Sequence, residues 1–294
     1  MNKKKLSQYR LTGSIHTLSL KVPGTVEVPE TAKDCVESCI HSERGHTHSN
    51  LKINPNKMNG EIYSFSQFNK TMEDIYDSMD IKEYRLMRVD MPLDSFDQEH
   101  YLKYAKLNKY LISLMAVTYS VRNCYKSVNL FSQKQLSIAV KNEYLELENY
   151  DKEAESGGKA PAKARLEIRS KAWKDNDYQT EFCERWVNRW NKALENRDEV
   201  TKRYNDELEK IYLEGKDSFP VQFRSLTDFL IQYSDCIFTK RQMINLLERF
   251  PEVKNAKNRA ENHKKRYGIE YFSDSDIKAA VKEIQRAIRS YFEK

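Results

Sequence analysis

The sequence predicts an α+β protein, with an antiparallel-rich sheet and covering helices followed by an all-helical C-terminal region. Before Lys171, apolar and polar side chains alternate with the period of two that strands impose, and two helix-like stretches interrupt the pattern. From Asp177 the apolar spacing becomes helical and stays so. Strands first and helices later is the order typical of α+β folds.

The expected strands are short alternating or apolar runs that end at turn residues. In the first of them, Leu18, Leu20 and Val22 share one face. Lys141-Asn142 fits a tight turn between two strands. The expected strands are residues 9–22, a short one from 50 to Asn54-Pro55, 83–93, 127–131, two within 135–150, and 164–170.

The expected helices carry apolar residues three and four apart and begin at capping residues. Thr239 is the expected cap of one helix, and Ser273 or Ser275 that of the last. The expected helices are a short one over 31–39, then 66–79, 97–119, 177–215 with a break near Asn196, one starting at Pro220, and the two capped ones.

Composition excludes several classes of protein. The 294 residues suffice for one large domain or two smaller ones, and 32% of them are charged. No run approaches the roughly 18 apolar residues of a membrane span, and the basic N-terminus lacks the apolar core of a secretory signal. Five scattered cysteines favour free thiols and a cytoplasmic location.

The excess positive charge lies at the C-terminal end of the chain. Residues 239–294 contain 14 basic and 8 acidic residues out of totals of 50 and 44, which leaves 36 of each elsewhere. A basic tail on a neutral body is typical of a polyanion-binding protein, although a solvated, lysine-rich helical surface has the same composition.

Several expected strands have one apolar and one charged face. Arg165, Glu167 and Arg169 alternate with Leu166 and Ile168. The same rule places Tyr84, Leu86, Arg88 and Asp90 on one face of their strand, and Tyr144, Glu146, Glu148 and Tyr150 on one face of theirs. An open charged face suits substrate binding, and it is equally the solvated face of an ordinary one-sided sheet.

Carboxylates recur near the ends of these strands. Asp90 precedes Met91-Pro92, Asp151, Glu153 and Glu155 precede a Gly-Gly loop, and Glu167 lies on the returning strand. Gathered carboxylates repel one another unless arginines or a cation hold them, and a hard divalent cation prefers such oxygen ligands. We therefore expect Mg²⁺ or Mn²⁺, with the ligands Asp90, Glu153, Glu155 and Glu167.

Three motifs occur in a familiar order. The segment "NYDKEAES…ARLEIRSKAW" resembles the YDK-x-x-E … R-[LF]-E-[IL]-R block of rolling-circle replication initiators from staphylococcal-type plasmids and filamentous phages. "EYRLMRVDMPLD" is similar to their R-[VIF]-D strand, and "KINPNKMNG" to a stretch in the phage group. The resemblance runs from about residue 50 to 190.

The resemblance implies a metal-assisted DNA strand transferase that nicks and rejoins a plasmid or phage origin through a phosphotyrosine. The positions that match the family's acidic, basic and YDK residues are Asp90, Tyr150, Asp151, Lys152, Glu155, Arg165, Glu167 and Arg169, with Glu153 as an extra acid. Its implied partners are single- and double-stranded DNA and host replication proteins. Neither a membrane nor a cofactor other than the metal is expected, and a homodimer is compatible with it.

The resemblance places the nucleophile shortly after the R-x-E-x-R strand, where Tyr178 falls. A tyrosine in the first turn of a helix also meets its phosphate-binding end. The same spacing, Tyr178, Phe182, Trp186, describes a core stripe, and Tyr150 and Tyr204 remain alternatives. Because a phenol has a pKa of about 10, a metal or lysine must activate it.

Three regions of function are expected, the first from these motifs and the last from the uneven distribution of charge. Residues 1–175 are the expected catalytic domain, 176–238 a helical extension packed on it, and 239–294 a basic DNA-binding region. His46-Thr47-His48 lies in an expected loop, where exposed histidines are favoured over a metal pair. A non-catalytic DNA-binding or partner-binding protein of a mobile element and a metal-dependent nuclease of another kind are the competing interpretations.

Overall fold

An antiparallel sheet forms the first half of the protein. The computed structural model describes residues 10–43, 47–97, 101–119, 138–141, 145–159, 162–171, 173 and 175–294. The sheet order is β3-β4-β2-β5-β8-β7-β6, with β1 paired to β5, and every pairing is antiparallel. The strands are β1 Thr12–Gly13, β2 Thr17–Pro23, β3 Val36–Ser42, β4 His48–Ile53, β5 Arg85–Ser95, β6 Ile138–Lys141, β7 Leu145–Asp151 and β8 Ala164–Ser170.

Helices make up most of the rest of the chain. Those between strands are α1 Asn56–Asn59, α2 Phe65–Ser78, α3 Tyr101–Thr118 and α4 Lys152–Glu155. After β8 come a π-helix Thr180–Trp186, α5 Val187–Glu195, α6 Arg197–Lys216, α7 Leu226–Gln232, α8 Lys240–Leu247, α9 Ala256–Tyr267 and α10 Asp274–Phe292. The α+β class is therefore confirmed. None of the helices in the described ranges is both long enough and apolar enough to cross a bilayer.

Two of the expected caps are confirmed. The Thr239 hydroxyl accepts a hydrogen bond from the Gln242 amide, and Ser273 forms a capping box with Asp276. The break near Asn196 also appears, between α5 and α6. The helix expected at Pro220 is wrong, because Ser225 caps α7 instead and accepts from the Asp228 amide.

The short helix expected over residues 31–39 is also wrong. Only a 3-10 turn, Glu30–Ala32, forms there, and β3 begins at Val36. Val36 and Ile40 are β-branched, and β4 offers backbone partners along the whole of β3, so pairing outweighs local helical spacing. The expected strand at 127–131 lies outside the described residues.

A β-bulge corrects the expected face of Leu86. Leu20 pairs with Leu86 and Ser19 with Arg88, so one extra residue, Met87, stands opposite a single step of β2. Leu86 is consequently buried while Arg88 and Asp90 keep the opposite, polar face. The bulge separates the apolar part of β5 from its charged part.

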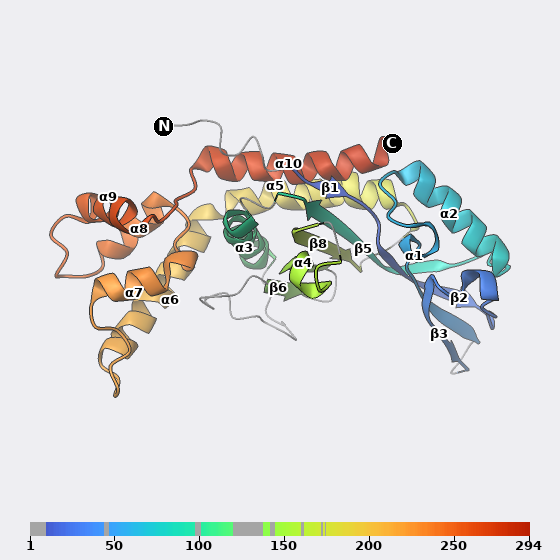
Figure 1. The fold of residues 1–294 in the computed structure, drawn as a ribbon, viewed down its shortest axis with the longest axis horizontal. Coiled ribbons are helices and arrows are strands. Elements are labelled where there is room, and N and C mark those ends of the chain that lie inside the picture. The colour runs from blue at the N-terminus through green and yellow to red at the C-terminus, as the bar shows by residue number, and fades with distance from the viewer. Residues whose placement is uncertain are drawn as a thin grey trace.

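One face of the sheet is covered by helices. Figure 1 shows α5 and α10 running side by side along that face, with α3 beside them, while α4 lies on the other side. Val89, Met91 and Ile168 point into this layer and are fully buried, as are Trp186 and Trp190. Burying a side chain of this size contributes about 1.5–3 kcal/mol, so the covered face is the stabilising one.

Candidate active site on the open face of the sheet

The register of β5, β8 and β7 arranges the polar side chains in three cross-strand rows. Asp90 and Glu146 stand on either side of Arg169. In the next row, Glu148 stands opposite Glu167, and in the third, Asp94 and Tyr150 flank Arg165. Opposite charges directly across strands attract, so the rows of Arg169 and Arg165 stabilise this register, whereas the like charges of Glu148 and Glu167 oppose it unless a cation lies between them.

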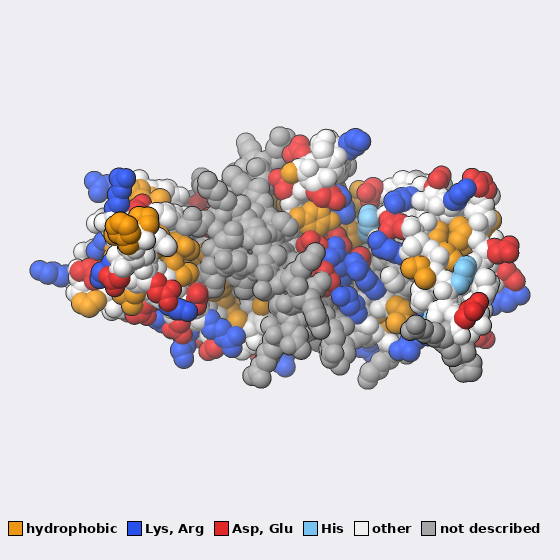
Figure 2. Space-filling model, turned by 90° about the horizontal axis from the view of Figure 1, so that it is seen from below, with side chains coloured by type: hydrophobic (Ala, Val, Ile, Leu, Met, Phe, Trp, Pro, Cys, Tyr) orange, Lys and Arg blue, Asp and Glu red, His pale blue; other side chains and the backbone are white. Residues whose placement is uncertain are grey.

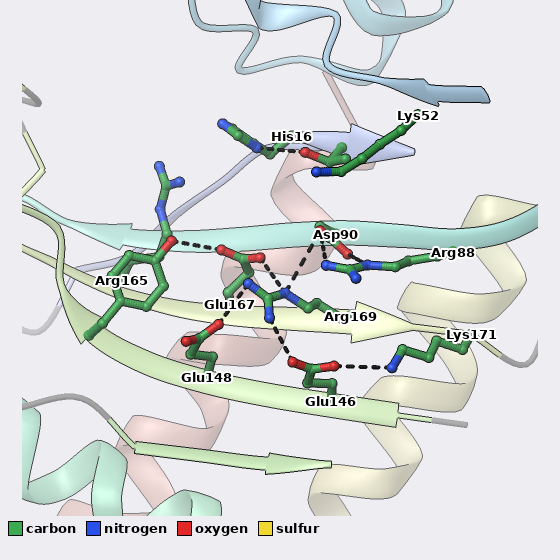
Figure 3. A network of polar contacts seen from close by, with 12 residues as sticks. His16, Lys52, Arg88, Asp90, Glu146, Glu148, Arg165, Glu167, Arg169 and Lys171 are labelled. Carbon is green, nitrogen blue, oxygen red and sulfur yellow. Dashed lines mark hydrogen bonds and ion pairs between the residues drawn. The ribbon is translucent and has the colours of Figure 1, made fainter. Parts of the chain in front are cut away.

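Arg169 lies at the centre of four carboxylates. Its Nε donates to Glu167 at 2.6 Å, Nη1 to Glu146 at 2.7 Å and Nη2 lies 2.7 Å from Glu148, with Asp90 at 3.7 Å (Figure 3). We call Asp90, Glu146, Glu148, Glu167 and Arg169 the carboxylate cluster. The expected convergence of Asp90 with Glu167 is present, held together by a guanidinium.

Two further cations contact the rim of the carboxylate cluster. Arg88 binds Asp90 through two hydrogen bonds of 2.6 Å, and Lys171 donates to Glu146 at 3.0 Å (Figure 3). Seen from below, acidic and basic side chains stand close together on the described part of this face (Figure 2). The face is thus close to neutral while holding many charges.

The four carboxyl groups differ in the direction of their pKa shifts, because burial dominates in two of them and neighbouring cations dominate in the other two. Burial raises the pKa of Asp90, which is 3% exposed, and the bond to Arg88 offsets only part of this. Burial likewise raises the pKa of Glu148 despite Arg169. In Glu146 and Glu167 the opposing cations outweigh burial, through Lys171 and Arg169 for Glu146 and mainly Arg169 for Glu167, so both pKa values are lowered.

Tyr150 brings a phenol to the edge of the carboxylate cluster. Its hydroxyl donates to Glu167 Oε2 at 2.7 Å, and Lys152 Nζ lies 5.8 Å from the centre of its ring. Burial, and then the Glu167 charge, raise the pKa of this phenol. Tyr150 is therefore protonated at neutral pH, and its hydroxyl is already hydrogen-bonded to an ionised carboxylate.

Arg165 is placed differently from Arg169. It forms a buried bidentate pair with Asp94, at 2.7 and 2.8 Å, and both side chains are 3% exposed. Arg165 is far less exposed than Arg88 and Arg169. Its charge acts on the Tyr150 phenol opposite it by lowering that pKa, against the larger effect of burial.

Glu153 and Glu155 lie apart from the carboxylate cluster, on α4. Their ion-pair partners are Lys163 and Lys152, each at 2.5 Å. Asp151 pairs with Ala164, three residues beyond the row of Glu148, a separation of roughly 10 Å along the strand. The structure thus brings together Asp90 and Glu167 of the expected ligands, and Glu146 and Glu148 take the places expected for the α4 acids.

Tyr178 lies in the aromatic core. Its ring contacts Phe65, Phe68 and Trp173 at centroid distances of 5.6–5.9 Å, and it is 8% exposed. Burial raises its pKa well above the ordinary value. The core-stripe interpretation describes this position, which is on the helix-covered side of the sheet. Tyr204 is also buried, with its hydroxyl 2.6 Å from that of Ser113.

Some neighbours of the cluster were not expected from the sequence. Glu146 and Glu148 were assigned only to a charged face, and His16 to an alternating strand. His16 Nδ1 lies 2.9 Å from Thr17 Oγ1, and the ring is close enough to Arg165 and Glu167 for their charges to act on it (Figure 3). Burial lowers its pKa, so it is neutral at pH 7. His48 begins β4 rather than lying in a loop, and His46 is outside the described residues.

The donor set has the chemistry of a hard-cation site, because carboxylate oxygens from three strands gather on one face. In the described ranges, however, no group of three or more His, Cys, Asp or Glu side chains is arranged to hold an ion as it stands. Arg169 separates the carboxylates, so Asp90, Glu148 and Glu167 approach one ion only when that guanidinium moves.

No protein-family model matches the chain, and no curated protein matches it. A solved rolling circle replication initiator protein from Geobacillus stearothermophilus is similar at 11% identity, with a TM-score of 0.28, over 68% of this chain and 84% of that chain. A likeness at this level carries no argument about the site.

Proposed function

We propose that the open face of the sheet nicks and rejoins one DNA strand at a plasmid or phage origin, as a rolling-circle replication initiator does. The observation that carries the proposal is the grouping of a phenol, an ionised carboxylate bonded to it, and a largely buried, arginine-centred set of acids on the polar face of the sheet. The motifs quoted above are the second support.

Tyr150 is the nucleophile in this proposal. Its Oη attacks the phosphorus of one phosphodiester, and Glu167 Oε2 accepts the phenol proton through the bond it already makes. Glu167 becomes basic enough for this step when Arg169, the main cation that lowers its pKa, turns from it to the phosphate. The Oη–P bond forms as the P–O3′ bond breaks, which leaves a 5′-phosphotyrosine and a 3′ oxygen that takes a proton from solvent. The reverse attack by a 3′ hydroxyl rejoins the strand and returns the proton to Tyr150.

The surrounding cations position the phosphate. Arg169 and Arg88 are 18% and 29% exposed at their side chains, so a phosphate oxygen reaches them from solvent. A guanidinium binds phosphate as it binds carboxylate, through paired hydrogen bonds. With Arg169 turned to the phosphate, Asp90, Glu148 and Glu167 Oε1 are the groups that would hold Mg²⁺ or Mn²⁺, which when bound would supply charge stabilisation of the leaving oxygen.

The test uses Tyr150→Phe and Tyr178→Phe as matched variants. Each is incubated with Mn²⁺ and a supercoiled plasmid carrying the gene for this chain. Nicked plasmid with protein covalently attached to the cut 5′ end is expected from the wild type and from Tyr178→Phe, and none from Tyr150→Phe. An adduct that persists in Tyr150→Phe and disappears in Tyr178→Phe would return the role to Tyr178.

The other outcomes separate the competing functions. Nicking without a protein–DNA adduct indicates a metal-dependent nuclease of another kind. Binding without any nicking indicates a DNA-binding protein, for which the arginine-paired carboxylates are only a solvated sheet surface.

A further inference from the structure

Helix α9 packs against the molecule through small side chains. Ala256, Ala260 and His263 are its buried residues, and α8 is a direct neighbour. Asn255 caps its N-terminus by accepting from the Asn258 amide, and Gly268 ends it in the left-handed conformation. The helix is fixed at both ends, and its opposite side is left to solvent. Figure 1 shows α8 and α9 at the end of the molecule far from β3.

The exposed side of α9 is a single stripe. Residues three or four positions apart are neighbours on the same face of a helix. The exposed residues on this stripe are Lys257, Asn258, Asn262, Lys265 and Arg266. We call these five the α9 face.

The α9 face is positive. Glu261 lies among its residues and is bonded to Lys240 of α8, so its charge is neutralised. The remaining cations of the helix, Arg259 and Lys264, are half-buried beside the face and add to its potential. A positive stripe with no unpaired carboxylate of its own is complementary to a phosphate backbone.

The two asparagines distinguish this surface from a simple charged patch. Asn258 and Asn262 are one turn apart in the middle of the stripe, with cations on both sides. Asparagine is one of the side chains that read adenine in the major groove through two hydrogen bonds. An α-helix with its side chains is about 10–12 Å in diameter and fits the major groove, which is about 12 Å wide, and the 12 residues of α9 extend about 18 Å.

We propose that the α9 face binds duplex DNA in the major groove, with Asn258 and Asn262 contacting adenine edges and Lys265 and Arg266 contacting phosphates. The proposal deepens the proposed function, on which it rests for the origin as target. Its chemistry is separate from nicking, because none of these residues belongs to the carboxylate cluster.

The full chain is used to select binding sites from a duplex pool with a randomised centre, and affinities are then measured by fluorescence anisotropy. Asn258→Ala/Asn262→Ala is expected to lose roughly 5- to 150-fold discrimination at adenine positions of the selected site, while still binding the pool. Alanine favours the helix, so folding is retained.

Lys265→Gln/Arg266→Gln is expected to weaken binding to every duplex and to reduce the slope of log affinity against log salt by about 2. The charge-matched control is Lys278→Gln/Lys282→Gln, on the exposed side of α10, with an unchanged slope.

Two results would overturn the proposal: the wild type selects no duplex sequence, or the asparagine variant selects the same one equally well. Tighter binding to single-stranded DNA or RNA of the same sequence, lost in these variants, would overturn the duplex assignment. Nicking of a single-stranded oligonucleotide is read in parallel. If neither the wild type nor any α9 variant nicks the oligonucleotide, the proposed function is contradicted, while the result on duplex binding still stands.

Discussion

Replacing Arg169 by methionine tests whether the guanidinium holds the carboxylate cluster together. Methionine keeps most of the length of the side chain and removes every hydrogen bond to Glu146, Glu148 and Glu167. Removing one partner of a buried ion pair costs about 3–5 kcal/mol, because the remaining charge is left unpaired. Arg169 serves several acids, so we expect the free energy of unfolding to fall by at least this range at pH 7.5.

The pH dependence gives the sharper result. In the wild type, Glu146 and Glu167 have lowered pKa values, so their stabilisation is present above the unfolded pKa and is lost as the pH falls. Removing Arg169 takes a pKa-lowering interaction away from both acids, so both pKa values rise and protonation costs the folded variant less. The deficit of the variant should therefore shrink between pH 7.5 and pH 5.

Urea unfolding followed by circular dichroism at the two pH values measures this difference. The control is Lys171→Met, because among the described residues Lys171 pairs with Glu146 and with no other acid of the cluster, and it is 27% exposed, so a loss of no more than about 1 kcal/mol is expected. An Arg169→Met protein within 1 kcal/mol of the wild type at pH 7.5, or with a deficit that grows on acidification, would refute the reasoning.

Three other changes test separate parts of the structure. Glu153→Gln/Glu155→Gln should leave the Mn²⁺ concentration for half-maximal nicking unchanged, and a rise of tenfold would restore these acids as metal ligands. Gly215→Ala should lower stability by about 1–3 kcal/mol in thermal unfolding, because the new Cβ would lie 2.2 Å from the Phe223 ring; an unchanged melting temperature counts against that contact. Glu181→Ala should cost about 3–5 kcal/mol, since this fully buried acid pairs with two arginines, and a loss below 1 kcal/mol contradicts its structural role.

The alternation of side chains predicts more of the site than the individual motifs do. A period of two is enough to place Arg165, Glu167 and Arg169 on one face, and the structure confirms it. The same rule fails at Leu86, because a bulge adds a residue that no local pattern marks. Faces follow from local sequence wherever the strand is regular.

Cross-strand register is the feature of the site that could not be predicted from short stretches of the sequence. Glu148 stands opposite Glu167 because β7 and β8 pair in one particular alignment across the Gly157-Gly158 loop. Counting along the chain instead favours Glu153 and Glu155, which are equally acidic and nearer to the loop. Both residues instead lie on α4, where Lys163 pairs with Glu153 and Lys152 with Glu155. They are close to Glu148 in the sequence but lie apart from the carboxylate cluster in space.

Burial bears on the choice between the two phenols proposed as nucleophile. Tyr178 fits the helical spacing of a core stripe, and it also fits the first turn of a helix, where a nucleophile could lie. The sequence alone does not distinguish these two interpretations. Burial separates them, because an attacking phenol must reach a phosphate, and each phosphate carries a charge that is costly to take into an aromatic core. Tyr178 is enclosed by Phe65, Phe68 and Trp173, whereas Tyr150 borders an ionised acid on the face where Arg88 and Arg169 remain open to solvent. A phosphodiester can therefore approach Tyr150 while keeping its charge paired, and this requirement favours Tyr150 over any tyrosine on the covered side of the sheet.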